Sequence, residues 1–582
     1  MTGLPSTLAT IWRLAAPYFR SEDRVTARVL LASVIVIELA LVAVDVLINQ
    51  WNNRFYNALQ DRDWDSFVYE LLFFCGLAVA YIVLAVYQLY LNQWLQIRWR
   101  QWMTKTYLND WLGSSNHYRM QLLGDAADNP DQRIAEDIRL FVEKTLEIGV
   151  GLLSAVVTLG SFVVILWLLS AAAPLYLFGT QISIPGYLVW AALLYAIVGT
   201  ILTHLIGWPL IRLNYDQQRY EADFRFNLVR VRENSEQIAL LEGEPAENSR
   251  LMSRFGRVAS NWMQIMSRTK KLTFLTAGYR QVSVVFPFVV VSPAYFAGAV
   301  QLGGLMQTAS AFNSVQNALS FFVTAYRQLA EWQSVIQRLN GFEQAVAAAR
   351  AAAVTPPVIE VMPTAGRGTI ELHDLAVSLP NGVPLVTASS VSVAPGDRVL
   401  VTGPSGSGKS TLFRALAGVW PFGRGRIHVP QGATVMMLPQ RPYFPVATLA
   451  EAIIYPAKPG SFSPDRVAEV LQAVGLPALA ERLAEEAPWN RMLSLGEQQR
   501  LGIARALLHA PDFLFLDEAT ASLDEPGEAA LYRLLTERLP ASTVVSIGHR
   551  STLRTFHHRH LVLVRDGEAH RVRETALEAA AR

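Results

Sequence analysis

Cysteine is almost absent from this sequence: Cys75 is the only one among 582 residues, so no intramolecular disulfide can form. Charged residues are also few. Asp, Glu, Lys and Arg make up 17% of the chain, whereas soluble proteins carry about 25%. The formal net charge is only +2, so bulk charge gives no reason to expect a nucleic-acid partner. Residues 1–28 lack a long apolar run, and we therefore expect no cleavable signal peptide.

Apolar residues are in excess, at 52% of the chain, and nearly all of this excess lies before residue 330. A helix needs about 20 apolar residues to span a bilayer. We identify six such segments: Val29–Ile48, Val68–Leu91, Leu146–Leu169, Gly186–Gly207, Gly278–Val300 and Leu305–Tyr326. The sequence therefore predicts an N-terminal segment at 1–28 and a six-helix, all-α transmembrane domain at 29–345.

The connections between these spans alternate between short and long, and Lys and Arg gather in the long ones. Residues 92–145 contain seven basic residues and residues 208–277 contain eleven, whereas the segment between the first two spans has only Arg54 and Arg62. Basic residues mark the cytoplasmic side of a membrane. We therefore expect the N-terminus, both long connections and everything after Tyr326 to be cytoplasmic. The long connections have helix-forming compositions, so the membrane helices are expected to continue through them.

Polar side chains interrupt the first and sixth spans. Glu38 and Asp45 are seven residues apart on the first span and so share a helical face. The sixth span carries polar residues mostly at helical spacing: Gln307, Ser310, Asn313, Asn317 and Thr324. Such residues either form hydrogen bonds between helices or face a water-filled cavity. Their density favours the second interpretation, and these seven residues are the predicted substrate cavity.

A glycine-rich motif follows the membrane half. The segment Arg398–Thr402 is apolar and strand-like, and a helix-compatible segment follows the motif, which is the context that a P-loop requires. Backbone N–H groups of such a loop surround phosphate oxygens; the lysine neutralises the outer phosphates and the serine ligates magnesium. The predicted phosphate-binding residues are Gly403, Pro404, Ser405, Gly406, Ser407, Gly408, Lys409, Ser410 and Thr411.

Two further apolar segments are each followed by candidate catalytic residues. Phe513–Leu516 leads into Asp517 and Glu518, and Thr543–Ile547 leads towards His549. In a P-loop domain the first carboxylate lies on the magnesium side and the second can polarise the attacking water. Together with the alternation of strands and helices from Gly368 onward, this pattern predicts an α/β P-loop domain at 368–582, after a linker at 346–367.

The segment Leu493–Arg500 resembles the signature peptide of ABC transporter ATPases. Gln440 resembles the glutamine of their Q-loop, Ala521–Asp524 resembles their D-loop, and His549 resembles their switch histidine. The resemblance implies that ATP and Mg²⁺ are bound, with Ser410, Gln440 and Asp517 near the metal and with Glu518, His549 and Gln440 catalytic. It also implies a head-to-tail dimer, in which Ser494, Gly496 and Glu497 of one copy face the ATP on the other copy.

Two positions depart from the family pattern. Leu495 stands where most signatures have glycine, and Glu497 where many have glutamine. We expect hydrolysis to survive, because Ser494 and Gly496 are retained. There is also no Phe, Trp or Tyr between Val354 and Val401, so the ring that usually stacks on adenine is missing. The histidines at 557, 558 and 560 are expected in a solvated loop and not at a metal.

The membrane half resembles the bacterial BacA/SbmA-related (YddA-type) ABC proteins and, more distantly, ABC subfamily D. The matching segments are Asn49–Gln60, Asp128–Asp137 and an EAA-like segment at Glu233–Glu244, which in that group docks on the ATPase domain. The resemblance implies an exporter-type fold and a homodimer in a bacterial inner membrane. It also implies import of a hydrophilic solute, such as a peptide or cobalamin. The alternatives are an acyl-CoA or lipid transporter and an ATP-gated channel or regulator.

Overall fold

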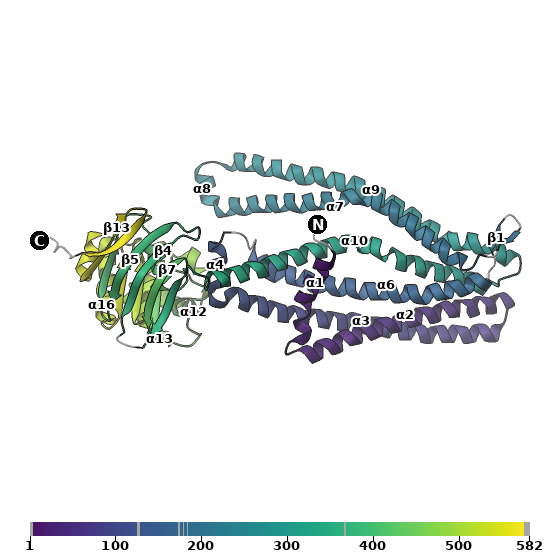
Figure 1. Ribbon diagram of the computed structural model, residues 1–582, viewed down its shortest axis with the longest axis horizontal. Coiled ribbons are helices and arrows are strands. Elements are labelled where there is room, and N and C mark those ends of the chain that lie inside the picture. Colours follow the sequence, from purple (N-terminus) through teal and green to yellow (C-terminus); the bar gives the residue numbers. More distant parts are fainter. Residues whose placement is uncertain are drawn as a thin grey trace. The chain divides into compact units, whose positions relative to one another are not determined.

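The computed structural model describes residues 4–124, 129–172, 175–177, 180–182, 184–365 and 368–575 (Figure 1). The chain divides into two compact units, each of which draws on two stretches of sequence. The first, called the membrane unit below, comprises residues 1–107 and 129–341. The second, called the ATPase unit, comprises residues 108–128 and 342–582.

The membrane unit is built from long helices. They are α1 (Leu4–Ala15), α2 (Arg24–Asp61), α3 (Trp64–Leu112), α6 (Ile138–Ala172), α7 (Tyr187–Glu233), α8 (Ser235–Leu240), α9 (Glu244–Phe296) and α10 (Leu302–Ala352). Shorter elements are η1 (Tyr18–Arg20), α5 (Pro130–Gln132), the π-helix η3 (Arg133–Asp137) and the hairpin of β1 (Leu175–Leu177) and β2 (Thr180–Ile182). The helices of the second and fourth spans continue into the long connections that follow them, as far as Leu112 and Glu233, and α9 runs from Glu244 in the second connection into the fifth span, as the sequence predicts.

Five of the predicted spans lie in helices that are long and apolar enough to cross a bilayer, among the residues that the structure describes. The sixth lies in α10, which is a 51-residue helix but is not one of those five. Its polar residues explain this, because Gln307, Asn313 and Asn317 lower its mean hydropathy. The fifth predicted span is too long: α9 ends at Phe296, and residues up to Val300 form a turn.

Helices α7 and α9 lie side by side, with α8 joining their ends (Figure 1). Specific contacts between side chains add to the apolar contacts between these two helices. The rings of Tyr195 and Tyr279 stack with centroids 4.3 Å apart, and the Tyr279 hydroxyl donates to the carbonyl oxygen of Tyr195 at 3.1 Å. Gly199 makes room for this contact, because a Cβ atom there would lie 2.4 Å from the Tyr279 ring. These contacts hold the two helices in register, and the Phe312 ring of α10 packs against the same place, with its centroid 6.2 Å from that of Tyr195.

The ATPase unit contains a ten-stranded sheet of order β3-β7-β4-β5-β14-β13-β6-β12-β11-β8. The strands are β3 (Ile359–Thr364), β4 (Ile370–Ser378), β5 (Pro384–Val393), β6 (Arg398–Thr402), β7 (Gly423–Pro430), β8 (Val435–Leu438), β11 (Phe513–Asp517), β12 (Thr543–Ile547), β13 (Arg559–Asp566) and β14 (Ala569–Thr575). From β13 to β8 every neighbour is parallel, whereas β4 runs antiparallel to both β5 and β7.

The remaining elements of this unit are the small sheet of β9 (Ala447–Thr448) and β10 (Glu486–Ala487) and a set of helices. The helices are α4 (Asn116–Leu122), α11 (Lys409–Leu416), α12 (Leu449–Ile454), α13 (Pro464–Ala473), α14 (Trp489–Met492), α15 (Leu495–His509) and α16 (Glu525–Arg538), with short 3₁₀ turns η2 (Gly113–Ser115), η4 (Pro477–Arg482) and η5 (Ser551–Phe556).

The parallel strands are apolar on both faces because each face has its own core. In β11, Leu514 and Leu516 belong to one buried cluster, while Phe513 and Phe515 belong to the other. Side chains alternate between the two faces of a strand, so a run without polar residues is the expected signature of a parallel strand covered on both sides. The three strands predicted from such runs are confirmed as β6, β11 and β12.

Three features of this unit were not foreseen. The sheet begins with β3, within the segment that the sequence assigns to a linker before Gly368. Helix α4 comes from the connection between the second and third spans, yet Tyr118 and Leu122 pack against the core of the ATPase unit. The predicted solvated histidine loop is wrong, because His557 and His560 are buried, at 6% and 8% exposure.

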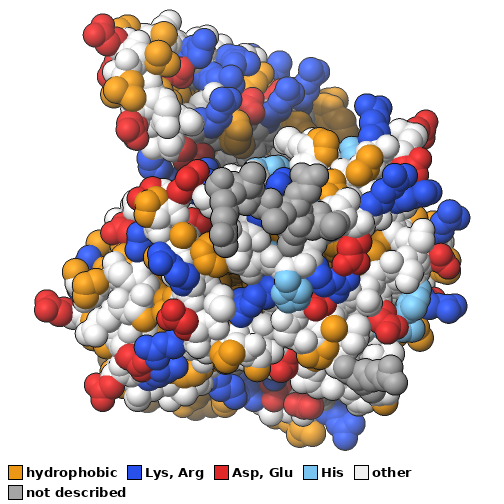
Figure 2. Space-filling model, turned by 90° about the vertical axis from the view of Figure 1, so that its left-hand side faces the viewer, with side chains coloured by type: hydrophobic (Ala, Val, Ile, Leu, Met, Phe, Trp, Pro, Cys, Tyr) orange, Lys and Arg blue, Asp and Glu red, His pale blue; other side chains and the backbone are white. Residues whose placement is uncertain are grey.

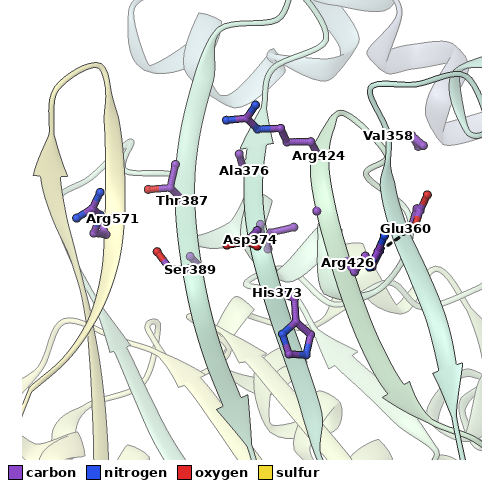
Figure 3. Close-up of a pocket in the computed structure, with 13 residues that line it drawn as sticks. Val358, Glu360, His373, Asp374, Ala376, Thr387, Ser389, Arg424, Arg426 and Arg571 are labelled. Atoms are coloured by element: carbon purple, nitrogen blue, oxygen red, sulfur yellow. Dashed lines mark ion pairs between the residues drawn. The ribbon is translucent and has the colours of Figure 1, made fainter.

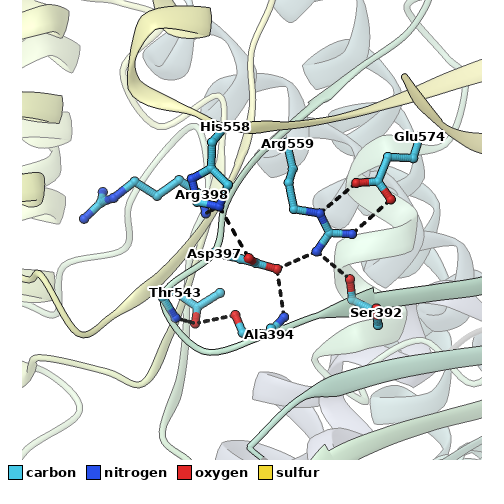
Figure 4. A network of polar contacts seen from close by, with 9 residues as sticks. Ser392, Ala394, Asp397, Arg398, Thr543, His558, Arg559 and Glu574 are labelled. Atoms are coloured by element: carbon cyan, nitrogen blue, oxygen red, sulfur yellow. Dashed lines mark hydrogen bonds and ion pairs between the residues drawn. The ribbon is translucent and has the colours of Figure 1, made fainter. Parts of the chain in front are cut away.

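A polar network fixes the turn from which β6 starts (Figure 4). Asp397 accepts the backbone N–H of Ala394 at 2.9 Å, is ion-paired with Arg559 and contacts His558. Arg559 also reaches Glu574 at 2.7 Å. Burial alone raises the pKa of Asp397, but the hydrogen bonds from Ala394, Arg559 and His558 outweigh it and lower the pKa. The strand that leads into the glycine-rich loop therefore starts from an anchored point.

Candidate nucleotide site

The glycine-rich loop connects β6 to α11, as the motif predicts. Gly408 precedes the helix with φ of 92°, and a Cβ atom there would lie 2.6 Å from Val386 Cγ2. Only glycine fits such a position, because the conformation and the close approach both exclude a side chain. The three residues at the tip of the loop, Pro404, Ser405 and Gly406, are exposed, and Thr411 is half-buried in the first turn of α11.

Lys409 lies across this loop. Its Nζ atom donates to the carbonyl oxygens of Gly403 and Pro404, both at 3.0 Å. Burial lowers the pKa of Lys409, and the negative charges of Glu518 and Asp517 act in the opposite direction. The buried hydroxyl of Ser407 has no hydrogen-bond partner among the described residues. A buried donor without a partner is costly, and a phosphate oxygen in the loop would satisfy it. The loop therefore fits a phosphate group.

The two residues predicted to lie on the magnesium side, Ser410 and Asp517, are in contact. Ser410 Oγ donates to Asp517 Oδ1 at 2.9 Å, so the end of β11 meets the start of α11. Burial raises the pKa of Asp517; the hydrogen bond from Ser410 opposes this shift, and the charge of Glu518 adds to it. A hydroxyl and a carboxylate at contact distance offer the oxygen ligands that Mg²⁺ prefers. A bound cation would also offset the cost of keeping this buried carboxylate charged.

Glu518 lies between two of the other predicted catalytic residues. Its Oε2 atom accepts from Gln440 Nε2 at 3.3 Å, and its Oε1 atom is 3.3 Å from His549 Nε2. The backbone of Glu518 is left-handed, with φ of 52°. Such a conformation is uncommon for a residue other than glycine and tends to occur where function requires it. The structure thus brings Gln440, Glu518 and His549 together from three separate loops.

The signature segment forms the start of α15, where Ser494 is the N-cap. Its Oγ accepts the backbone N–H of Glu497 at 3.3 Å, and Glu497 Oε2 accepts the N–H of Ser494 at 2.9 Å and its hydroxyl proton at 2.7 Å. This reciprocal capping explains why glutamate suits position 497. Gly496 lies against the D-loop, since a Cβ atom there would be 3.3 Å from Leu523 Cδ2. Leu495 is the first residue of the helix.

The D-loop is positioned by two residues that sequence reasoning missed. Gln499 is buried; its Nε2 donates to the Gln440 carbonyl oxygen at 3.0 Å, and its Oε1 accepts the N–H of Ser522 at 2.9 Å. Arg550 donates to the carbonyl oxygen of Leu523 at 2.7 Å. Asp524, a predicted site residue, caps α16 by accepting the N–H of Gly527 at 3.2 Å. The only sequence signals for these two residues are that Gln499 lies within the signature segment and that Arg550 follows the switch histidine.

The polar residues of the membrane unit have different surroundings. Gln307 is buried between α10 and α2: its Oε1 accepts from Asn53 Nδ2 at 2.6 Å, and Asn49 Nδ2 donates to its carbonyl oxygen at 3.0 Å. At this position the helix-to-helix bonding interpretation holds. Glu38 is buried and accepts from Gln88 at 2.8 Å.

The other predicted cavity residues are less enclosed. Asp45 and Asn317 are exposed, and Ser310 and Asn313 are half-buried. The side chain of Thr324 lies outside the described residues. Exposed polar side chains on a helix of a membrane unit need water or a protein partner. Whether they line one cavity stays a prediction.

Comparisons with known proteins agree with this architecture. Residues 14–296 match the family model of the ABC transporter transmembrane region 2, and residues 386–521 match that of the ABC transporter. The chain is 35% identical to the inner membrane ABC transporter ATP-binding protein YddA of Escherichia coli, over 92% of this chain and 94% of YddA. The chain belongs to the ABC transporter family. Its relatives include, more distantly, the lysosomal cobalamin transporter ABCD4 of Mus musculus, 27% identical over 94% of this chain and 92% of that one.

The fold of this ABC transporter is that of an exporter. A solved bacterial Atm1-family ABC exporter with ATP bound superposes with a TM-score of 0.73 at 19% identity, over 94% of this chain and 95% of that chain. The predicted fold class is thereby confirmed: a helical transmembrane domain is followed by an α/β ABC ATPase domain. Such an ATPase domain binds ATP, normally with Mg²⁺, and implies hydrolysis coupled to transport.

Proposed function

We propose that this ABC transporter is a half-transporter that works as a homodimer and imports a hydrophilic solute, such as a peptide or cobalamin, across a bacterial inner membrane. One observation supports ATP-driven transport in particular. Glu518 contacts both Gln440 and His549, beside the hydrogen-bonded pair of Ser410 and Asp517. A domain that only bound nucleotide would not need a carboxylate held between an amide and an imidazole.

We assign each residue of the nucleotide site one role in ATP hydrolysis. The P-loop amides and Lys409 hold the outer phosphates, and Mg²⁺ neutralises part of their charge when bound. Ser410 and Asp517 would hold the metal, with Gln440 at its side. Glu518 accepts the proton of the attacking water, which is general-base catalysis. His549 orients the Glu518 carboxylate and contacts the γ-phosphate.

The homodimer follows from what one chain contains. Each chain has one P-loop and one signature segment. Within one chain, the Ser494 side chain is bonded to Glu497, and Gly496 lies near Ser522 and Leu523 of the D-loop. Two copies arranged head to tail would bring each signature to the other copy's Lys409, and a closed two-fold pair is the commonest symmetry for such an interface. The same two-fold axis would place two copies of α10 around a shared path.

The polar face of α10 and the relatives of this chain support a hydrophilic solute. Half-exposed amides and hydroxyls on α10 suit a hydrophilic cargo, and ABCD4 is named a cobalamin transporter. The basic residues of the long connections favour a cytoplasmic ATPase unit and N-terminus, and YddA is named an inner membrane protein. Import is proposed from the sequence resemblance to the BacA/SbmA-related proteins. An acyl-CoA or lipid transporter is the second candidate, because subfamily D relatives are among the matches.

Reconstitution separates these possibilities. Purified protein in proteoliposomes should take up radiolabelled cobalamin or a labelled peptide only when ATP and Mg²⁺ are enclosed in the lumen, where they reach ATPase units that face inward, and uptake should stop when the enclosed ATP is omitted. Uptake of acyl-CoA but of neither hydrophilic solute would favour the second candidate. Flux that continues after ATP removal would indicate an ATP-gated channel instead.

The homodimer is tested by mixing two inactive variants. A pair of Lys409→Ala and Ser494→Arg chains can form one intact composite site, so their co-reconstitution should restore part of the ATPase activity that each variant lacks alone. No restoration, or full activity from isolated wild-type monomers, would contradict the composite site.

A further inference from the structure

Two histidines and a glutamate meet on the solvent side of the antiparallel part of the sheet. Glu371 and His373 lie on β4, and His428 lies on the neighbouring strand β7. Glu371 is paired directly with His428 in the register, and His373 is the next residue on the same face. The alternate residues Leu372 and Ile427 point into the core. Alternation along both strands therefore directs all three polar side chains to one side.

The three side chains already converge. Their ligand atoms all lie within 4.8 Å of one another. His373 Nε2 is 3.0 Å from Glu371 Oε2, and the rings of His373 and His428 have centroids 4.9 Å apart. Directly paired residues on adjacent strands hold their Cβ atoms about 5 Å apart. The register of β4 and β7 therefore sets this spacing without support from any loop.

The surroundings leave one side of the cluster open. His373 is at the edge of a shallow cavity of about 650 Å³ on the sheet face (Figure 3). The nearest cation lining it, Arg426, is ion-paired with Glu360 at 3.4 Å, so its charge is partly neutralised. Next to His373 the strand has a bulge, where Asp374 is left-handed with φ of 44°. Bulges redirect side chains and recur next to functional sites.

We propose that Glu371, His373 and His428 bind a divalent transition-metal ion of the zinc class. Imidazole and carboxylate groups suit Zn²⁺, Cu²⁺, Ni²⁺ or Fe²⁺. Three protein ligands with an open position are the usual set of an accessible zinc site, in which water completes the shell. Mg²⁺ is not expected to bind, because it prefers oxygen ligands. His373 is exposed, and Glu371 and His428 are half-buried, so ions from solvent can reach the cluster. Figure 2 shows histidine side chains at the surface among charged residues of both signs.

This site is separate from the magnesium side of the nucleotide site. Strands β5, β14 and β13 lie between β4 and β6, the strand that leads into the P-loop. A metal ion at the cluster would cross-link β4 to β7, and through β7 it would stabilise the edge strand β3. The proposal does not depend on transport or on ATP hydrolysis.

The first test measures Zn²⁺ binding to the full-length protein in detergent. The protein is purified without a polyhistidine tag and carries Cys75→Ser, which removes the only thiol. Titration against a chromophoric chelator should show one site per chain. His373→Ala and His428→Ala should each weaken that site by at least about tenfold, since even outer-shell partners of a metal have effects of that size. His570→Ala is the matched control, because His570 is a half-exposed histidine of β14 in the same sheet. It should leave the site unchanged.

The second readout is thermal stability. Zn²⁺ should raise the unfolding midpoint of the wild-type protein and of His570→Ala, but not that of the double variant His373→Ala/His428→Ala. Mg²⁺ should have no such effect. Basal ATPase activity without added zinc should be retained in all variants, which shows that they fold. If the folded double variant binds Zn²⁺ as tightly as the wild type, the cluster is only an ion pair and the proposal is wrong.

Discussion

Arg338 binds the carboxylate of Asp137 with both sides of its guanidinium group, across 201 residues of sequence. Its Nε atom is 2.9 Å from Oδ2, and its second terminal nitrogen is 2.5 Å from Oδ1. Arg133 reaches Oδ2 from one turn earlier, at 2.6 Å. Asp137 is fully buried, so this pair of arginines is what makes a charged carboxylate tolerable there. The contact joins the π-helix η3, before α6, to α10.

Removal of this carboxylate should destabilise the membrane unit strongly. Asp137→Ala leaves two guanidinium groups without their shared partner, and breaking a buried ion pair costs about 3–5 kcal/mol. We expect a clear fall in the unfolding midpoint, measured by intrinsic fluorescence in detergent. The control is Arg139→Met, which removes an exposed pair with Glu143 and should cost about 0–1 kcal/mol. Equal shifts for the two variants would contradict this account.

Glu518→Gln should abolish steady-state ATP hydrolysis and leave ATP binding intact. The amide keeps the shape of the side chain and its contacts with Gln440 and His549, but it cannot accept a proton from water. Loss of a general base costs on the order of 10²-fold or more in turnover. Phosphate release gives the rate, and a fluorescent ATP analogue gives the affinity. A rate within about twofold of wild type would exclude Glu518 as the base.

Gln499→Leu should lower the turnover of ATP more than the affinity for ATP. The substitution keeps the volume but removes both hydrogen bonds, so the backbone at Gln440 and at Ser522 loses its link. Gln499 is buried and acts only through these two segments. Each lost hydrogen bond costs about 1 kcal/mol, which is about fivefold in rate for one bond and roughly thirtyfold for both if the arrangement is needed in the transition state.

A matched variant separates positioning from folding. Gln499→Glu retains the acceptor for the N–H of Ser522 but loses the donor to the Gln440 carbonyl oxygen. The buried carboxyl also faces that carbonyl oxygen, so Gln499→Glu should have a lower unfolding midpoint than Gln499→Leu, whereas its turnover, measured on the folded protein, should be reduced because the link to Gln440 is lost in both variants. If both variants hydrolyse ATP at the wild-type rate, the link has no part in catalysis.

The ATPase unit should lose stability as the pH falls from about 6.5 to about 4, because of His557. Its Nδ1 is 2.7 Å from the Leu553 carbonyl oxygen and its Nε2 is 2.9 Å from Ser546 Oγ, which suits a neutral ring. Burial lowers the pKa of His557 from its ordinary value of 6.5 to about 4. Between these values the unfolded chain binds a proton that the folded chain does not. Stability therefore rises with pH in this window.

His557→Gln should flatten that part of the profile. The folded variant has no imidazole to keep neutral, so the difference in proton uptake between the two states disappears. The effect of His557 is on the order of 3 kcal/mol across the window. Urea unfolding of the full-length protein at several pH values measures it. His558→Gln is the control, because His558 is exposed. Unchanged slopes in His557→Gln would show that other groups cause the pH dependence.

The sequence predicts those parts of the structure that depend on local patterns. The strands β6, β11 and β12 follow from apolar runs that end in motif residues, and the meeting of Gln440, Glu518 and His549 follows because parallel strands end at one edge. The burial and hydrogen-bond partners of Gln307 and Asp137 could not be predicted in this way. Each is decided by a partner more than 200 residues away, Asn49 for the first and Arg338 for the second. Equally, only the register of β4 and β7 brings His428 to Glu371.

The last prediction concerns the polar face of α10. Asn313→Leu combined with Asn317→Leu should impair uptake of a hydrophilic solute into proteoliposomes, because two amides on the proposed path are replaced by apolar groups. Basal ATPase activity should remain, since neither residue belongs to the nucleotide site. The matched control is Gln307→Leu, which removes a side chain bonded to Asn53 between α2 and α10. That variant should lower stability and not selectively reduce transport.

Accessibility decides between a cavity and contacts between helices. In a Cys75→Ser background, single cysteines at 313 and 317 should react with a membrane-impermeant thiol reagent. Their rates should change between the nucleotide-free protein and the ATP-bound Glu518→Gln variant, because alternating access exposes the path to different sides. A cysteine at 307 should stay protected in both states. If the cysteines at 313 and 317 are as protected as the one at 307 in both, these asparagines join helices, and the solute must pass elsewhere.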